Sequence, residues 1–183
     1  MLGPSAPDPG DHLASALSTG SMRIIAVVSS ALLLMASAIS HSWGQAPSLP
    51  SKADQEKAVR TVVTEFGKRL RMVAILAPKE MVVAAMDQEY SAYVAANLLA
   101  TWKNNPEIAP GKRTSSPSPE RIDISSIEAT GPNSYAVTGE VILLTAQERR
   151  EGGVFQANPV TMIVARQHGN WVITAYAEKE SSP

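Results

Sequence analysis

The stretch APGKRTSSPSPERI, residues 109–122, separates two parts of the chain that have different hydrophobic periods. Before it, apolar residues recur at spacings of three and four, which is the period of a helix lying on a core. After it, apolar and polar residues alternate, which is the period of a strand with one buried face. Each part therefore has an apolar face that needs a partner. We interpret the stretch as an ordered crossover within one domain rather than a linker between two.

Three helical segments are expected before this crossover. Ser51 and Asp54 form a capping-box pattern, and the apolar stripe after them predicts a helix of about 24 residues that ends at Pro78. Helices are also predicted over residues 79–89 and 95–104. The methionines at helical spacing, Met81 and Met86, are interpreted as core side chains.

Four strands are expected after the crossover. They cover residues 121–128, 134–147, 154–167 and 171–178, and short runs of turn residues separate them. Because consecutive strands joined by short turns pair antiparallel, the sequence predicts a meander. The inner face of the last strand is expected to carry Trp171, Ile173, Ala175 and Ala177. The predicted fold class is α+β, with N-terminal helices packed on a curled four-stranded antiparallel sheet.

The N-terminal region has the pattern of a targeting segment. Residues 22–46 contain one cation, then an apolar stretch, then small and polar residues, which is the order of a secretory signal peptide. The alternative is an uncleaved anchor, since the apolar stretch is only slightly shorter than a bilayer span. Residues 1–21 contain no Lys or Arg and are expected to be a disordered or mis-assigned upstream extension. A linker at 47–53 and a single α+β domain at 54–180 complete the predicted organisation.

Composition argues against several function classes. Sixteen Lys and Arg residues oppose seventeen Asp and Glu, so no basic surface for nucleic acid is expected. The absence of cysteine excludes disulfides and thiolate nucleophiles. His168 lies in a QHGN turn pattern, so neither histidine catalysis nor a metal site is expected, and we expect no cofactor.

Three segments of the sequence carry a resemblance to a known group. FGKRLRMVAILAP (66–78), YVAANLLATWKNNPEIAPGKRTSSPSPERIDISSIE (93–128) and YAVTGEVI (135–142) resemble uncharacterised exported bacterial proteins with a nuclear-transport-factor-like, or cystatin-like α+β, domain. The resemblance covers roughly residues 55–178 and implies a cone-shaped fold that hosts both enzymes and binding modules. Members of the group often have an aromatic residue where this chain has Ser118, so a stacking role for the crossover is not expected.

The crossover contains one group of candidate ligand-binding side chains. Its cations and hydroxyl groups have the chemistry of an anion site. The members of this group are Lys112, Arg113, Ser115, Ser116 and Arg121. In the alternative interpretation, Arg121 anchors the crossover to a carbonyl or an acid, and the other two cations face solvent.

Tyr90 and Tyr93 form a second candidate group with Asp87. An acid beside two phenols is similar to the sites of ketosteroid-isomerase-like enzymes. Glu89 lies beside them on the same predicted helix. In the alternative, Asp87 and Glu89 face water at the helix end and the tyrosines pack between helix and sheet.

The sequence leads to one functional expectation and two alternatives. We expect an exported, non-catalytic binding or assembly module of the bacterial cell envelope, whose partner is an envelope protein or a small ligand. Membrane contact is expected only through an uncleaved N-terminal segment, and the sheet is a candidate homodimer surface. The alternatives are a small-molecule enzyme of the ketosteroid-isomerase or dehydratase type, and a membrane-anchored component of a secretion or sporulation complex.

Overall fold

A computed structural model describes residues 50–179 of the chain. The extension predicted at 1–21 and the signal peptide or anchor predicted at 22–46 lie outside the described residues, as do residues 47–49 of the predicted linker. Lys52 and Ala53, which the predicted linker also includes, belong to the first helix. No helix within residues 50–179 has the length and apolar character needed to span a membrane.

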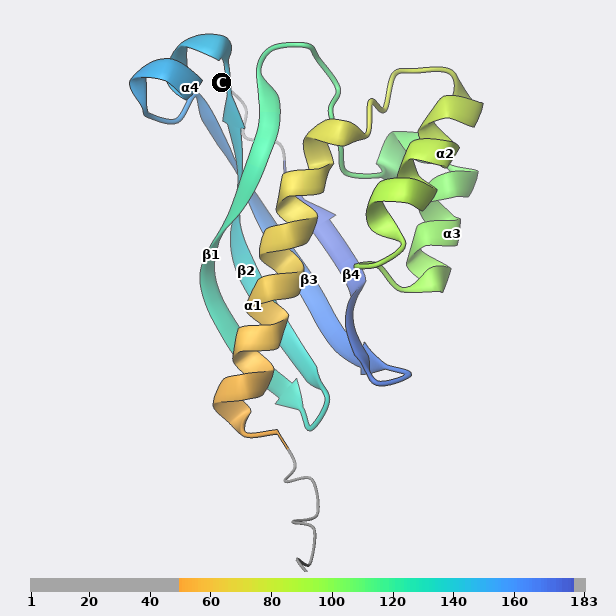
Figure 1. The fold of residues 1–183 in the computed structure, drawn as a ribbon, viewed down its shortest axis with the longest axis vertical. Coiled ribbons are helices and arrows are strands. Elements are labelled where there is room, and N and C mark those ends of the chain that lie inside the picture. The colour runs from red at the N-terminus through yellow and green to blue at the C-terminus, as the bar shows by residue number, and fades with distance from the viewer. Residues whose placement is uncertain (1–49, 180–183) are drawn as a thin grey trace, which may run out of the picture. The chain divides into compact units, whose positions relative to one another are not determined.

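The sheet has the meander topology that the sequence predicts. Its strands are β1 (Ser118–Gly131), β2 (Ser134–Leu144), β3 (Gln156–Gln167) and β4 (Asn170–Glu178), paired antiparallel in the order β1-β2-β3-β4. Figure 1 shows helix α1 (Lys52–Arg69) lying across one face of the curled sheet. Helices α2 (Lys79–Tyr90) and α3 (Ala96–Asn104) pack together beside it, toward β4. The α+β fold class is therefore confirmed, and we call the face covered by these helices the inner face.

The first helix is shorter than its apolar stripe predicts. The predicted capping box at Ser51 and Asp54 is present, but α1 ends at Arg69 and a single 3₁₀ turn follows. Val73 then adopts an extended conformation, with φ −104° and ψ 102°. The chain pairs here with the crossover: the Lys112 amide donates to the Val73 carbonyl at 2.8 Å, and the Ile75 amide donates to the Lys112 carbonyl at 2.9 Å. Val73 and Ile75 remain buried, so apolar spacing alone could not reveal this change of conformation.

An aromatic cluster forms the centre of the core between the helices and the sheet. The ring of Phe66 lies 5.0 Å from that of Tyr90, 6.4 Å from that of Trp102 and 6.0 Å from that of Tyr176. Met86 is fully buried beside this cluster, as expected, whereas Met81 is 64% exposed because α2 turns that side outward. The expectation that Met81 is a core residue was wrong.

A β-bulge in β4 changes which of its side chains face inward. Ile163 pairs with Ala175 and Val164 pairs with Ile173, so the residue between them has no partner on β3. Because an extra residue reverses the alternation of side chains, Tyr176 and Glu178 follow Ile173 on the inner face. Ala175 and Ala177 are exposed, which corrects the inner face expected from strict alternation.

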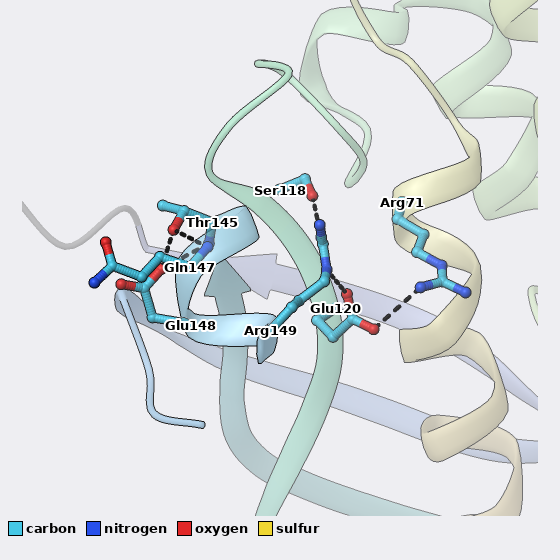
Figure 2. Close-up of polar contacts among 7 residues, drawn as sticks. All are labelled: Arg71, Ser118, Glu120, Thr145, Gln147, Glu148 and Arg149. Atoms are coloured by element: carbon cyan, nitrogen blue, oxygen red, sulfur yellow. Dashed lines mark hydrogen bonds and ion pairs between the residues drawn. The ribbon is translucent and has the colours of Figure 1, made fainter. Parts of the chain in front are cut away.

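The strand predicted over residues 134–147 ends at Leu144, where a short helix begins. Thr145 is the N-cap of α4 (Ala146–Glu151), and its hydroxyl and amide both donate to the Glu148 carboxylate (Figure 2). The residues TAQE at this point are a capping-box sequence, a helix start signal that the strand prediction ignored. Ile142 and Leu144, at the end of β2 against which α4 packs, are buried.

Candidate ligand-binding cavity

A cavity of about 640 Å³ lies between the crossover and the ends of β2, β3 and β4. Its apolar wall includes Leu70, Ile108, Val141 and Leu143. Four polar side chains from β3 and β4, which we call the polar end, line it as well: Gln156, Asn158, Tyr176 and Glu178. A cavity of this size that combines apolar walls with converging polar groups is the usual form of a small-molecule site.

Hydrogen bonds within the polar end converge on one carboxylate. Gln156 Nε2 donates to Asn158 Oδ1 at 2.8 Å, and Asn158 Nδ2 donates to Glu178 Oε1 at 2.9 Å. The Tyr176 hydroxyl donates to Glu178 Oε2 at 2.6 Å. Asn158 is only 4% exposed, so its amide is held in a fixed orientation. The Glu178 carboxylate is therefore positioned through both of its oxygens.

Strands β3 and β4, which pair with each other, bring these four residues together. Gln156 and Asn158 are two residues apart on β3, in phase with the buried Val160. Glu178 pairs with Val160 in the register of β3 and β4, so it lies beside Asn158. The bulge in β4 is what turns Tyr176 and Glu178 to the same side, and without it their side chains would point away from the cavity.

Burial and charge keep the Tyr176 phenol protonated. Desolvation is the main cause that raises the pKa of Tyr176 well above 10, and the negative charge and hydrogen bond of Glu178 act in the same direction. Arg113 has a smaller, opposite effect on this pKa. Tyr176 therefore remains a hydrogen-bond donor to Glu178 at neutral pH.

Tyr90 does not line the cavity but holds the part of the crossover that does. Its ring is fully buried, and its hydroxyl donates to the Pro110 carbonyl at 2.8 Å, which fixes the crossover to α2. Burial, followed by the charge of Glu89, raises the pKa of Tyr90 far above its ordinary value.

Asp87 and Tyr93 do not join Tyr90 in an acid and phenol site. Asp87 is exposed on α2, where both of its carboxylate oxygens accept from Lys103 at 2.7 and 2.8 Å. Tyr93 is half-buried, and its carbonyl accepts from the Ile173 amide at 2.8 Å. The geometry at Asp87 matches the structural alternative, so the enzyme hypothesis built on Asp87, Tyr90 and Tyr93 is not favoured. The expectation that Glu89 faces water was wrong, because Glu89 is buried and accepts from Arg69 at 3.2 Å.

The candidate residues of the crossover are also divided among different surroundings. Arg113 lines the cavity, and its Nη2 donates to the carbonyls of Glu107 at 2.8 Å and Ala109 at 3.3 Å. Lys112 and Ser115 border a separate, smaller depression of about 200 Å³, and Ser116 is exposed.

Arg121 lies on the opposite side of β1 from the buried Ile122. Its guanidinium binds Asp123 through bonds of 2.8 and 3.0 Å, and the hydrogen bond to Asp123 raises the pKa of Arg121. Of the predicted anion-site residues, the structure thus brings only Arg113 to the cavity.

A cluster of charges anchors the end of the crossover (Figure 2). Glu120 accepts from Arg71 at 3.1 Å and from Arg149 at 2.8 Å, and Arg149 also donates to the Ser118 hydroxyl at 2.7 Å. Ser118 is buried and has a defined partner here. The cluster joins the 3₁₀ turn after α1, the start of β1 and helix α4, so it stabilises one wall of the site.

Sequence reasoning missed all four residues of the polar end. A signal for two of them was present, because Gln156 and Asn158 continue the even-numbered alternation of Val160, Met162 and Val164 onto the buried face. Polar side chains in phase with a core stripe indicate an interior polar site. Tyr176 and Glu178 had no comparable signal, since the bulge that reorients them leaves no mark on the pattern.

Comparisons with known proteins find solved structures of low similarity and indicate no function. No family model and no curated protein match the chain. The chain is similar to a solved structure of a variant of the protein Rd1NTF2_05, with 15% identity, a TM-score of 0.35, and coverage of 69% of this chain and 100% of that one. It is also similar to an NTF-2-like protein of unknown function from Shewanella oneidensis MR-1, with 16% identity, a TM-score of 0.31, and coverage of 68% and 88%. Because this similarity is low, the assignment of the α+β architecture rests on the chain's own topology. The chain therefore belongs to the structural class of helix-covered, curled-sheet domains, here with a ligand-sized cavity.

Proposed function

We propose that this protein is a non-catalytic binding module that takes a small molecule with an apolar body and a polar head into the cavity. The observation that carries the proposal is the cavity of about 640 Å³ in which four polar side chains of β3 and β4 lie together. Leu70, Val141 and Leu143 would cover the apolar body, and the polar end would orient the head. The volume falls within the range of roughly 300–1,000 Å³ that is typical of such sites.

The arrangement of Glu178 favours binding over catalysis. Among the residues that line the cavity, all within the described part of the chain, Glu178 is the single carboxylate. Both of its oxygens accept hydrogen bonds from the protein, so the carboxylate is held in a fixed orientation. The described residues that line the cavity include neither a second carboxylate nor a histidine, so they supply no pair of groups for a two-carboxylate or a histidine-based mechanism.

We further propose that the module works outside the cytoplasm, as a secreted or cell-envelope protein. The support is the signal-like order of residues 22–46. The N-terminal residue of protein recovered from cells that express the full chain tests this point. Soluble protein that begins between residues 39 and 47 supports export. Membrane-bound protein that retains residues 22–46 would instead favour the anchored component.

Binding can be tested with three probes that share one ring system and differ in the head. They are naphthylmethylamine, naphthylmethanol and naphthoate, and calorimetry on the recovered protein measures their affinities. We expect at least one to bind at a single site. Leu143→Trp should abolish that binding by filling the cavity, with Leu143→Phe as a milder second variant. Met81→Trp, at an exposed position on α2, is the matched control. Failure of all three probes would overturn the proposed function.

A further inference from the structure

The direction of the hydrogen bonds in the polar end indicates which head the cavity prefers. Asn158 Oδ1 accepts from Gln156, so the Asn158 Nδ2 group is turned toward Glu178. The Tyr176 hydroxyl also donates to Glu178. Two of the three bonds therefore end on the Glu178 carboxylate, whose oxygens are acceptors.

The Glu178 carboxylate has acceptor capacity beyond these bonds. A carboxylate offers about four lone-pair positions, and the two donors found within residues 50–179 use one on each oxygen. The Tyr176 oxygen, having donated its proton, is an acceptor as well. A ligand head that donates several hydrogen bonds fits this set, whereas a carboxylate head would place its charge against that of Glu178.

The electrostatic effect of Glu178 on its neighbours also favours a cationic head. Glu178 raises the pKa of both Tyr176 and Tyr90, so its negative charge reaches two phenols on different elements. The charge of Arg113 lowers the pKa of Tyr176, but this effect is the smallest of those that act on the phenol. The Arg113 guanidinium is held by the carbonyls of Glu107 and Ala109, on the crossover side.

We propose that the cavity selects ligands with a protonated amine head, which donates to Glu178 and to the Tyr176 oxygen while the apolar body packs on Leu70, Val141 and Leu143. This inference rests on the proposed function and names the ligand class of the same site. An ammonium group has three donors and one positive charge, which complements the acceptors and the charge of the polar end.

The order of affinities among the three probes tests this inference on the unmodified protein. Naphthylmethylamine, protonated at neutral pH, should bind about tenfold or more tighter than naphthylmethanol, because a charge-assisted hydrogen bond exceeds a neutral one. Naphthoate should bind most weakly. Equal affinities for amine and alcohol, or tightest binding of naphthoate, would overturn the inference and leave the proposed function standing. No binding of any probe would overturn both.

A single variant assigns the preference to Glu178. Glu178→Gln keeps the shape, since the amide oxygen can accept from Asn158 and the amide nitrogen can donate to the Tyr176 oxygen. It should lower the affinity for naphthylmethylamine by more than the affinity for naphthylmethanol, so that the two affinities become about equal. Glu140→Gln, at an exposed position on β2, is the control and should retain the preference for the amine. A preference that persists in Glu178→Gln would contradict the inference, and if this variant does not fold, the probe order above decides it.

Discussion

Tyr176 and Glu178, two residues apart on β4, are joined by a 2.6 Å hydrogen bond from the phenol to the carboxylate. The bond positions the carboxylate and removes the phenol from water. Tyr176→Phe should therefore cost about 1–2 kcal/mol of unfolding free energy, because a partly buried charge loses one of its donors. Urea unfolding at pH 7 measures the loss. Tyr176→Phe should also weaken binding of naphthylmethylamine, since the ligand's second acceptor is gone, and unchanged stability together with unchanged binding would contradict the role of this bond.

The same two residues make stability sensitive to alkaline pH. The folded-state pKa of Tyr176 is raised, whereas the unfolded phenol ionises near pH 10. The stabilisation from the protonated phenol is thus fully present below about pH 10 and is lost as pH rises beyond it, by about 1.4 kcal/mol per pH unit per phenol. Unfolding free energies at pH 8.5 and about pH 11 should therefore fall less in Tyr176→Phe than in the unmodified protein. Identical slopes in the two proteins would contradict the raised pKa.

Gly67 allows α1 to approach β1 closely. A Cβ at this position would lie 2.7 Å from the Ile122 amide nitrogen and 3.0 Å from Ile122 Cγ1. Gly67→Ala should destabilise by about 1–2 kcal/mol, because overpacking exceeds the gain in helix propensity. Lys68→Ala, at the next and exposed position, should stay within about 0.5 kcal/mol. A Gly67→Ala variant that melts higher than the parent would show that the helix can shift away from the sheet.

The shared carboxylate of Glu120 should contribute modestly and in a salt-dependent way. Glu120 is 24% exposed and its partners Arg71 and Arg149 are 50% and 39% exposed, so solvent screens both pairs. Glu120→Gln should cost less than about 1 kcal/mol in low salt, and less again at 1 M salt. Denaturant unfolding at the two ionic strengths measures this, with Glu65→Gln, which breaks the pair between Lys68 and Glu65, as the control. A loss that does not depend on salt would indicate a packing role instead.

The crossover should resist proteolysis despite its composition. The backbone of Lys112 is bonded on both sides to the segment after α1, and Tyr90 holds the Pro110 carbonyl. Trypsin should therefore cut slowly after Lys112 and Arg113, compared with Arg150 in the short helix α4. Mass spectrometry of a limited digest reads the order of cleavage. Rapid cleavage after Lys112 into two stable fragments would restore the two-domain interpretation.

Sequence patterns predicted the layers of this fold well because the hydrophobic period changes sharply from that of a helix to that of a strand at the crossover. The four strands and the helices over residues 79–104 follow directly from apolar spacing and turn residues. The errors lie where tertiary contacts override the period. Val73 and Ile75 pair with the crossover instead of continuing a helix, and the β4 bulge exchanges Ala177 for Tyr176 on the inner face.

The candidate site was less predictable than the fold. Arg113 and Tyr90 were found from their chemistry and lie at or beneath the cavity. Glu178 was not found, because its position depends on one unpaired residue in β4 and on the register with Asn158. Long-range register and bulges are set by packing of the whole sheet, which a local pattern does not contain.

Mapping the bound probe by amide NMR tests the central claim, that the cavity is a binding site, most directly. Naphthylmethylamine is titrated into the recovered protein while the amide resonances are followed. The account predicts saturable shifts that are largest at Val141, Asn158 and Tyr176 and that disappear in Leu143→Trp. Shifts confined to exposed apolar residues such as Leu76 and Met81, or the same shifts in Leu143→Trp, would contradict it.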